Sequence, residues 1–377
     1  MSTVNTPRVE EGLEGILVTK TRASLVDGAA GRLVVAGEDV EALAERATFE
    51  EAAAQLFRSV GDPSPNHADP AELQRAIGEG RALAFATLPG AAASLAQGDA
   101  MDALRGAMAA LPAAFATEPA HLIGAAAVFV AAHARVRDGL APIAPDPRRA
   151  HAADFLAMLG MEDAAPSASD ARARALGAYL VTVMDHGLNA STFAARVVAS
   201  TGSDLVSSVV AAIGALKGPL HGGAPGPVLD MLDAIGAPER AEQWLDAELA
   251  SGRRIMGMGH RVYRVRDPRA LVLERATTAL EAAGIRTGRL TLARAVERAA
   301  EGALKRRHPE RSLAANVEFY TAVLLDAVGI PRTHFAATFA VGRVAGWCAH
   351  VFEQRATGRL IRPDALYVGE RPASVVA

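Results

Sequence analysis

The sequence predicts an all-α protein with at most a small β element near the N-terminus. Half of its 377 residues are hydrophobic, yet only 5% are aromatic, and alanine is abundant throughout. Many segments place apolar residues at positions i, i+3, i+4 and i+7, which is the spacing of one helix face. Short stretches of Gly, Pro and Asp separate these segments. Ten or more helices with short connections are therefore expected.

The expected elements follow in order along the chain. The β signal is confined to GILVTKTRASLVDG (15–28) and GRLVVAG (31–37), which together predict a small hairpin or sheet. The segment VEALAERATFEEAAAQLF (40–57) predicts an amphipathic helix with acids and arginines on its outer face. Further helical segments are expected at 71–88, 102–116, 121–140, 170–188, 226–235, 269–284, 292–307, 319–330 and 339–358.

Composition argues against several classes of protein. The formal net charge is −3, so neither nucleic acid nor an anionic membrane is expected as the main partner. Cys348 is the one cysteine, which leaves no intramolecular disulfide. Apolar stretches such as 124–134 are too short to span a bilayer, and the N-terminal segment lacks the apolar core of a secretory signal. A soluble cytoplasmic protein is expected.

Three segments rich in glycine or proline interrupt the helical pattern. Pro142, Pro145 and Pro147 predict a rigid, extended connection because proline cannot continue a helix. A second break is GALKGPLHGGAPGP (214–227), and a third is MGMGHRVY (256–263). Each break is compatible with a tight turn or with a hinge, and composition does not separate the two.

Three histidines lie in these breaks or beside them rather than inside helices. His186 lies in DHGLNAST, His221 in GPLHGGAPG and His260 in GMGHRVYRVRDPRA. A neutral histidine donates a hydrogen bond near neutral pH, which suits it to polarise a carbonyl group. Arginines follow His260 and recur at 359 and 362, and guanidinium groups match carboxylate and phosphate oxygens. The pattern indicates a site for a small polyanion with a reactive carbonyl.

Structural explanations compete with this interpretation. A histidine beside glycine is more often a turn or cap residue than a catalyst. The arginine-rich run before Asp267 and Pro268 is typical of a solvated helix start, and DHGLNAST is compatible with a simple helix terminus. The remaining histidines, at 67, 121, 133, 151, 308, 334 and 350, are interpreted as structural or surface residues. The spacings HxxxH and CxxC do not occur, so no metal site is expected.

The order of the segments outweighs these separate explanations. DHGLNASTFAARVVAST, GPLHGGA, GMGHRVYRVRDPRA, NVEFYTAVLL and GRLIRPDALYVG, taken together and in this order, resemble the citrate synthase family in its shorter bacterial and archaeal form. The likeness covers most of the chain and is weakest around 58–120. It implies a nearly all-helical homodimer. Residues 1–217 plus 323–377 would form a large dimerisation domain, and residues 218–322 a small domain on the CoA side of an intervening cleft.

The resemblance also implies roles for individual histidines and arginines. His221 corresponds to the histidine that hydrogen-bonds the thioester carbonyl of acetyl-CoA, and His260 to the one that polarises the oxaloacetate ketone. The residues matching the family's remaining substrate contacts are His186, Arg269 and Arg362 for oxaloacetate, Arg264 for a CoA phosphate, and Arg371 for a site in the partner subunit.

The general base of the family is usually an aspartate in an NV-Asp-F motif, where this chain has Glu318. The carboxylate is retained, but one added methylene moves it, and a misplaced base costs rate. The resemblance therefore implies an acyltransferase that condenses acetyl-CoA with oxaloacetate and water to give citrate and CoA, without a cofactor. Two alternatives stay open: a 2-methylcitrate synthase that uses propionyl-CoA, and a catalytically weakened paralogue that binds CoA or oxaloacetate.

Overall fold

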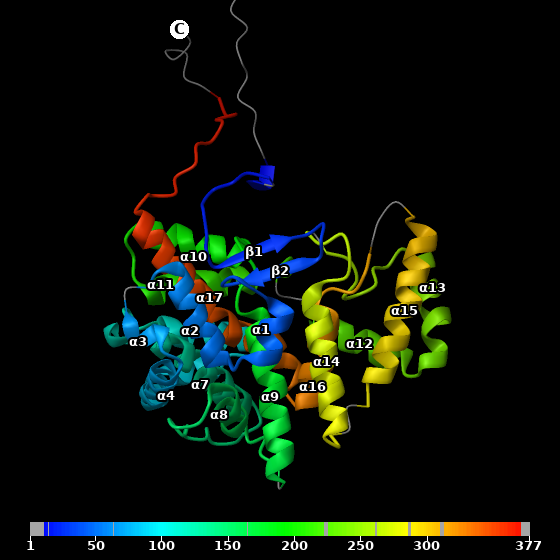
Figure 1. The fold of residues 1–377 in the computed structure, drawn as a ribbon, viewed down its shortest axis with the longest axis horizontal. Helices are drawn as coiled ribbons and strands as arrows, with labels where there is room; N and C mark the ends of the chain where they lie inside the picture. Colours follow the sequence, from blue (N-terminus) through cyan, green and yellow to red (C-terminus); the bar gives the residue numbers. More distant parts are fainter. Residues whose placement is uncertain are drawn as a thin grey trace, which may run out of the picture.

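The computed structural model describes residues 11–370 except 14, 63, 164, 222–224, 261, 286–287 and 310–312. The described residues form an all-α fold with one small sheet, as predicted (Figure 1). Short 3₁₀ turns lie at Glu11–Leu13, Ala113–Phe115, Pro238–Arg240 and Arg332–His334. The α-helices are α1 (Val40–Arg46), α2 (Phe49–Val60), α3 (Pro65–Ala68), α4 (Pro70–Ala86), α5 (Leu88–Leu95), α6 (Ala100–Ala109), α7 (Pro119–Arg137), α8 (His151–Leu159), α9 (Pro166–Val183), α10 (Ala190–Ser200), α11 (Leu205–Leu216), α12 (Pro225–Ile235), α13 (Ala241–Ala250), α14 (Pro268–Ala282), α15 (Leu290–Arg307), α16 (Val317–Val328) and α17 (Phe335–Thr357).

The β element is the predicted hairpin with one added strand. Strands β1 (Ser24–Asp27), β2 (Arg32–Val35) and β3 (Glu38–Asp39) are antiparallel in the order β1-β2-β3. Ser24 pairs with Val35, and Asp27 pairs with Arg32. This register places the hairpin turn next to the loop that carries His260, since the backbone N–H of Arg264 donates to the carbonyl of Gly28 at 2.9 Å.

The segment 40–57 differs from its prediction, because it forms two helices instead of one. Thr48 begins α2 with a capping box: its side chain accepts from the Glu51 N–H at 3.2 Å, and the Glu51 carboxylate accepts from the Thr48 N–H at 2.8 Å. A capping box satisfies two backbone donors that a new helix leaves unpaired. The apolar spacing continues across the break, so periodicity alone did not reveal it.

Two long apolar helices form the centre of the core. α7 is buried on nearly every side and packs against α4, α6 and α17, while α17 also contacts α2, α9 and α10. By length and composition, Pro119–Arg137 and Arg332–Thr357 could each cross a membrane, but 83% of the apolar window of each is buried inside the protein. Burial of this kind is what the core helices of a globular protein show.

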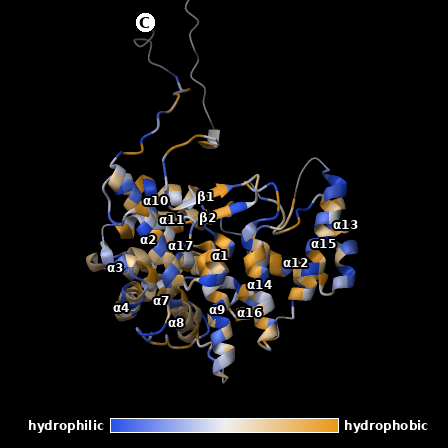
Figure 2. Ribbon diagram, in the orientation of Figure 1, coloured by the Kyte–Doolittle hydropathy of each residue, from blue (hydrophilic) through white to orange (hydrophobic). Residues whose placement is uncertain are grey.

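Helices α12, α13 and α15 lie at one end of the molecule, beyond α14 and α16 (Figure 1). α13 packs on α15 and α12 packs on α16, whereas α14 joins this group to the main body by packing on α9. Hydrophilic residues are prominent on the outermost of these helices, α13 (Figure 2). The predicted small domain, 218–322, covers this group, but its C-terminal boundary falls inside α16. The division into domains stays a prediction.

Candidate active site

The candidate site is built from the loop after α9, the loop before α14 and the first turn of α16. His186 follows α9, His260 precedes α14, and their rings lie 5.7 Å apart between centroids. The Tyr263 ring is 4.8 Å from that of His260, and its hydroxyl is 3.1 Å from His186 Nε2. The three rings therefore form one cluster. Tyr263 was not among the predicted site residues.

The His260 loop is tied to the segment that precedes Glu318. The Gly259 N–H donates to the carbonyl of Ala314 at 2.8 Å, and the Asn316 N–H donates to the carbonyl of Gly257 at 2.9 Å. Gly257 and Gly259 have φ of 73° and 81°, a backbone region that side chains strongly disfavour. These glycines allow two segments distant in sequence to pair through backbone hydrogen bonds. His260 follows one of the paired segments and Glu318 follows the other.

His260 is held in one neutral tautomer. Its Nδ1 accepts the backbone N–H groups of Val262 and Tyr263, each at 3.0 Å, so the ring proton resides on Nε2. Burial and the positive charge of Arg269 lower the pKa of His260 to about 4. At neutral pH the ring therefore offers an uncharged N–H donor, the form needed to polarise a carbonyl oxygen.

Arg269 supplies positive charge beside this donor. Its Nη2 lies 3.5 Å from His260 Nε2, and its Nε and Nη2 donate to the Asp267 carboxylate at 3.0 and 2.8 Å. Asp267 also caps α14 and accepts the N–H of Val317 at 3.2 Å. The Asp267 carboxylate thus orients the buried guanidinium of Arg269. The same carboxylate links α14 to α16.

Arg343 is a second buried guanidinium, and sequence reasoning missed it. It lies in the middle of α17, is 1% exposed, and donates from Nε to the carbonyl of Val183. Burial lowers the pKa of Arg343 to about 10, with Asp185 opposing that shift and Arg269 adding to it. Its segment was interpreted as a plain core helix; the available signal was a single arginine within an otherwise apolar run.

The charges of both arginines lower the pKa of His186. Burial, followed by the charges of Arg269 and Arg343, holds the pKa of His186 well below its usual range. A cluster of uncharged imidazoles beside two guanidinium groups presents several hydrogen-bond donors, two of them charged side chains. Such an arrangement can bind a small dicarboxylate and polarise its carbonyl group.

His221 follows α11 and is oriented from α10. Its Nε2 accepts the backbone N–H of Ser191 at 3.3 Å and lies 2.8 Å from the Ser191 hydroxyl oxygen, which leaves the ring proton on Nδ1. Burial, then the charge of Arg343, lowers the pKa of His221 to about 4. His221 is therefore a second neutral donor, and Ser191, not singled out from the sequence, sets its direction.

Glu318 has the properties of a general base near neutral pH. It is in the first turn of α16, where its N–H donates to the side chain of the cap residue Asn316 at 3.0 Å. Burial raises the pKa of Glu318 to about 7, although Arg269 partly opposes the shift. A base whose pKa matches the working pH transfers protons efficiently.

Two further predicted site residues, Arg264 and Arg362, are not brought to this cluster within one chain. Arg264 is exposed, with a backbone contact to Gly28. Arg362 lies on the exposed segment after α17, which extends away from the body on the same side as the N-terminal segment (Figure 1). Arg371 lies outside the described residues. Arg266, from the same run as Arg264, pairs with Glu274 and Glu297 on neighbouring helices.

Known proteins match this chain over most of its length. The family described as "Citrate synthase, C-terminal domain" matches residues 12–364. The citrate synthase of Haloferax volcanii is 38% identical over 384 residues, which cover 96% of each protein. A Mycobacterium tuberculosis protein, named as a candidate second citrate synthase, is 49% identical over 200 residues, 53% of this chain and 52% of that relative. The match thus spans about half the length of that relative.

A solved structure agrees in fold. The citrate synthase of Thermoplasma acidophilum, solved in a ternary complex with carboxymethyl coenzyme A and oxaloacetate, superposes with a TM-score of 0.82 at 27% identity, covering 99% of each chain. The fold of this chain is therefore that of a known citrate synthase. The chain belongs to the citrate synthase family. The resemblance inferred from the five ordered motifs is confirmed.

Proposed function

We propose that this enzyme condenses acetyl-CoA with oxaloacetate and water to give citrate and CoA. The observation that carries the proposal is the buried carboxyl of Glu318, which has a pKa of about 7 and interacts electrostatically with Arg269, whose Nη2 lies 3.5 Å from Nε2 of the neutral donor His260. Removing a methyl proton from a thioester requires a base and simultaneous stabilisation of the enolate oxygen. The site contains a group suited to each task.

Oxaloacetate would bind among His186, Arg269 and Arg343. The complex of the Thermoplasma relative, which contains oxaloacetate, supports this class of substrate. Arg362 was predicted to share the task, but within its own chain it lies on an exposed segment. We therefore propose that Arg362, together with Arg371, acts in the site of a second copy in a homodimer. Arg264 is proposed to contact a CoA phosphate.

The steps follow from the protonation states. Glu318 removes a proton from the acetyl methyl group, while the Nδ1–H of His221 donates to the thioester oxygen and so stabilises the enol. The enol carbon attacks the ketone carbon of oxaloacetate, whose oxygen takes charge against His260 Nε2–H and Arg269. Water then hydrolyses the citryl thioester and releases CoA. These steps need no metal or redox cofactor, so none is proposed.

The proposal extends to the organisation of the protein. Residues 218–322 would move as a small domain and close the cleft on oxaloacetate, because binding energy can drive such a closure. The burial of both long apolar helices in the core supports a soluble, cytoplasmic enzyme.

The acyl group is tested by measuring CoA thiol release with oxaloacetate present, comparing acetyl-CoA with propionyl-CoA. Higher kcat/KM with acetyl-CoA is expected, whereas a preference for propionyl-CoA would indicate a 2-methylcitrate synthase. Glu318→Gln should lower kcat about 1000-fold, since general bases contribute factors of this size. Glu301→Gln makes the same chemical change at an exposed position of α15 and should leave kcat unaltered. No release with either thioester, despite oxaloacetate binding, would favour the weakened paralogue.

A further inference from the structure

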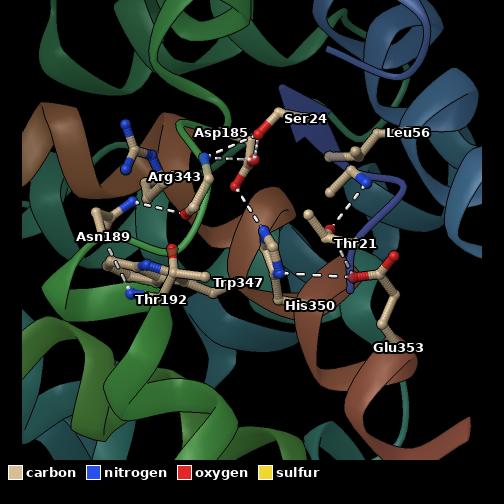
Figure 3. Close-up of polar contacts among 12 residues, drawn as sticks. Thr21, Ser24, Leu56, Asp185, Asn189, Thr192, Arg343, Trp347, His350 and Glu353 are labelled. Atoms are coloured by element: carbon tan, nitrogen blue, oxygen red, sulfur yellow. Dashed lines mark hydrogen bonds and ion pairs between the residues drawn. The ribbon is translucent and has the colours of Figure 1, made fainter. Parts of the chain in front are cut away.

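A buried polar network joins Asp185, the residue before His186, to His350 on α17 and is not used by the proposed chemistry (Figure 3). Asp185, Arg196 and His350 are each 0% exposed. His350 Nε2 lies 3.1 Å from Asp185 Oδ1, and Arg196 Nη1 lies 2.9 Å from His350 Nδ1. Arg196 also donates to the carboxylate of Glu353 at 2.9 Å. Buried polar groups are costly unless they are fully bonded, so a network of this kind holds its members in one arrangement.

The network determines the tautomer of His350. A guanidinium nitrogen can only donate, so His350 Nδ1 must accept from Arg196 and the ring proton must reside on Nε2. That proton is donated to Asp185. Arg196 is itself oriented by Glu353, by Gln354 Oε1 at 3.1 Å and by Thr19 at 2.9 Å. The direction of the His350 donor is thus set by contacts on three separate segments of the chain.

Asp185 links this network to the loop that carries His186. Its carboxylate also accepts from the hydroxyl of Ser24 and from the Gly187 N–H at 3.1 Å. The residues on both sides of His186 are therefore held by one carboxylate. Burial alone would raise the pKa of Asp185, but His350, Arg343 and Ser24 outweigh it and keep the pKa below its usual range. Asp185 is thus a buried anion, and it is the charge that opposes the pKa depression of Arg343.

The placement of His350 on α17 reinforces the link to the site. Arg343, Trp347 and His350 follow the spacing i, i+4 and i+7, which is one face of a helix. On that face Trp347 donates to the Ser191 hydroxyl, the group that contacts His221, at 3.2 Å. A Cβ on Gly346 would lie 2.1 Å from the Met184 carbonyl oxygen, so this face approaches the His186 loop as closely as backbone allows.

We propose that His350 is a positioning residue for the oxaloacetate half of the site. Its hydrogen bond to Asp185 fixes the carboxylate that holds the His186 loop. The same carboxylate is the negative charge that acts on the guanidinium of Arg343. The inference rests on the proposed function, because it assigns His350 to the binding of the keto acid and not to the acyl-CoA. A merely structural role for His350 would change stability without separating the two substrates.

The test compares two substitutions of His350 in the full-length enzyme. His350→Leu removes both hydrogen bonds at similar volume, whereas His350→Gln retains an acceptor for Arg196 and a donor for Asp185. We expect His350→Leu to raise the KM for oxaloacetate about tenfold or more, the scale of a lost hydrogen bond to a charged group. The KM for acetyl-CoA should change less than about twofold, and His350→Gln should recover most of the oxaloacetate affinity.

A matched control is Val351→Ala, which shortens the neighbouring buried side chain on α17 without touching the network. It should lower the melting temperature and leave both KM values unaltered. If His350→Leu behaves like this control, or if His350→Gln is as impaired as His350→Leu, the proposal is wrong.

Ser24→Ala provides a second route if His350→Leu fails to fold, because it removes another donor to Asp185 from a different segment. The same rise in the oxaloacetate KM is expected, and an unchanged KM would overturn the proposal. Oxaloacetate binding to the wild-type enzyme, measured by calorimetry, separates the two hypotheses. A wild-type enzyme that neither binds oxaloacetate nor condenses it would refute the proposed function and this inference together. An active wild type with an unaltered variant would refute this inference alone.

Discussion

His67 and His260 are both enclosed by protein, yet their surroundings drive them to opposite charge states. His67 lies between two carboxylates, with Nδ1 2.7 Å from Asp62 and Nε2 2.7 Å from Glu118. Burial opposes its charge, but Asp62 and Glu118 raise the pKa of His67 to about 9. Burial together with the adjacent Arg269 lowers the pKa of His260 to about 4.

Burial lowers the pKa of both histidines, so the difference between them comes from the sign of the neighbouring charges. At neutral pH the His67 region is an ion-pair cluster that ties the loop after α2 to the start of α7. The His260 region is a set of uncharged donors beside guanidinium groups. We infer that the first region serves stability and the second serves catalysis, and four predictions test that division.

The largest effect is expected for His260→Ala. Loss of the Nε2–H donor should lower kcat/KM about 100- to 1000-fold, the usual consequence of removing one donor to a developing oxyanion. The melting temperature should change little, since the ring accepts only local backbone N–H groups. Steady-state kinetics and thermal unfolding measure the two quantities. A large loss of stability with normal turnover would show that His260 serves stability and not catalysis.

The pH dependence of kcat sharpens the comparison. Among the proposed catalytic groups, Glu318 titrates near neutrality, with a pKa of about 7, whereas His221 and His260 have pKa values of about 4. The rate should rise with pH through about 7 and fall about tenfold per unit below it, because the base must be ionised. A kcat profile that is flat between pH 5.5 and about 8 would exclude Glu318 as the base.

His67→Leu should affect stability and not turnover. The substitution leaves Asp62 and Glu118 facing one another without the imidazolium, and removing one partner of a buried ion pair costs about 3 kcal/mol. The melting temperature should fall by about 5 °C or more, while kcat and both KM values stay near wild type. Reduced kcat in a variant that remains folded would show that this region also contributes to catalysis.

The smallest effect is a pH dependence of stability. The folded-state pKa of His67, about 9, exceeds its ordinary value of 6.5, so the charged form favours folding. This contribution is complete below pH 6.5 and is lost as the pH rises through about 9. The difference in unfolding free energy between wild type and His67→Leu should therefore shrink from pH 6 to pH 10. A difference that stays constant would show that His67 is uncharged.

Local sequence patterns predicted the fold well, because helices depend mainly on neighbouring residues. The hairpin near the start follows from apolar spacing and from glycine and proline breaks, as do α2, α4, α6, α7, α9, α12 and α14 to α17. The expected helical segments did not include α3, α5, α8, α10, α11 or α13. Asp267 and Pro268 begin α14, and Asn189 caps α10, as their motifs indicated. The break at Thr48 was missed although its capping box is itself local. That error came from weighing periodicity above a helix-start signal.

The candidate site was predicted less completely. The ordered motifs placed His186, His260, Arg269 and Glu318 in one functional set. In the structure the rings of His186 and His260 are in contact, Arg269 Nη2 lies 3.5 Å from His260 Nε2, and Glu318 interacts electrostatically with Arg269. Arg343 was missed because an arginine inside an apolar helix gives no spacing signal. For Arg362 the situation is reversed. Its motif is clear, but within a single chain its side chain is exposed.

The sequence by itself determined the helical architecture and the family and led to most of the proposed site residues, because these depend on local spacing and motif order. Only the tertiary structure decided which arginines are buried beside the histidines, which tautomer each ring adopts, and that His350 supports Asp185 across 165 residues of sequence. Protonation and hydrogen-bond direction depend on burial and on charges brought together from distant segments. No local pattern contains that information.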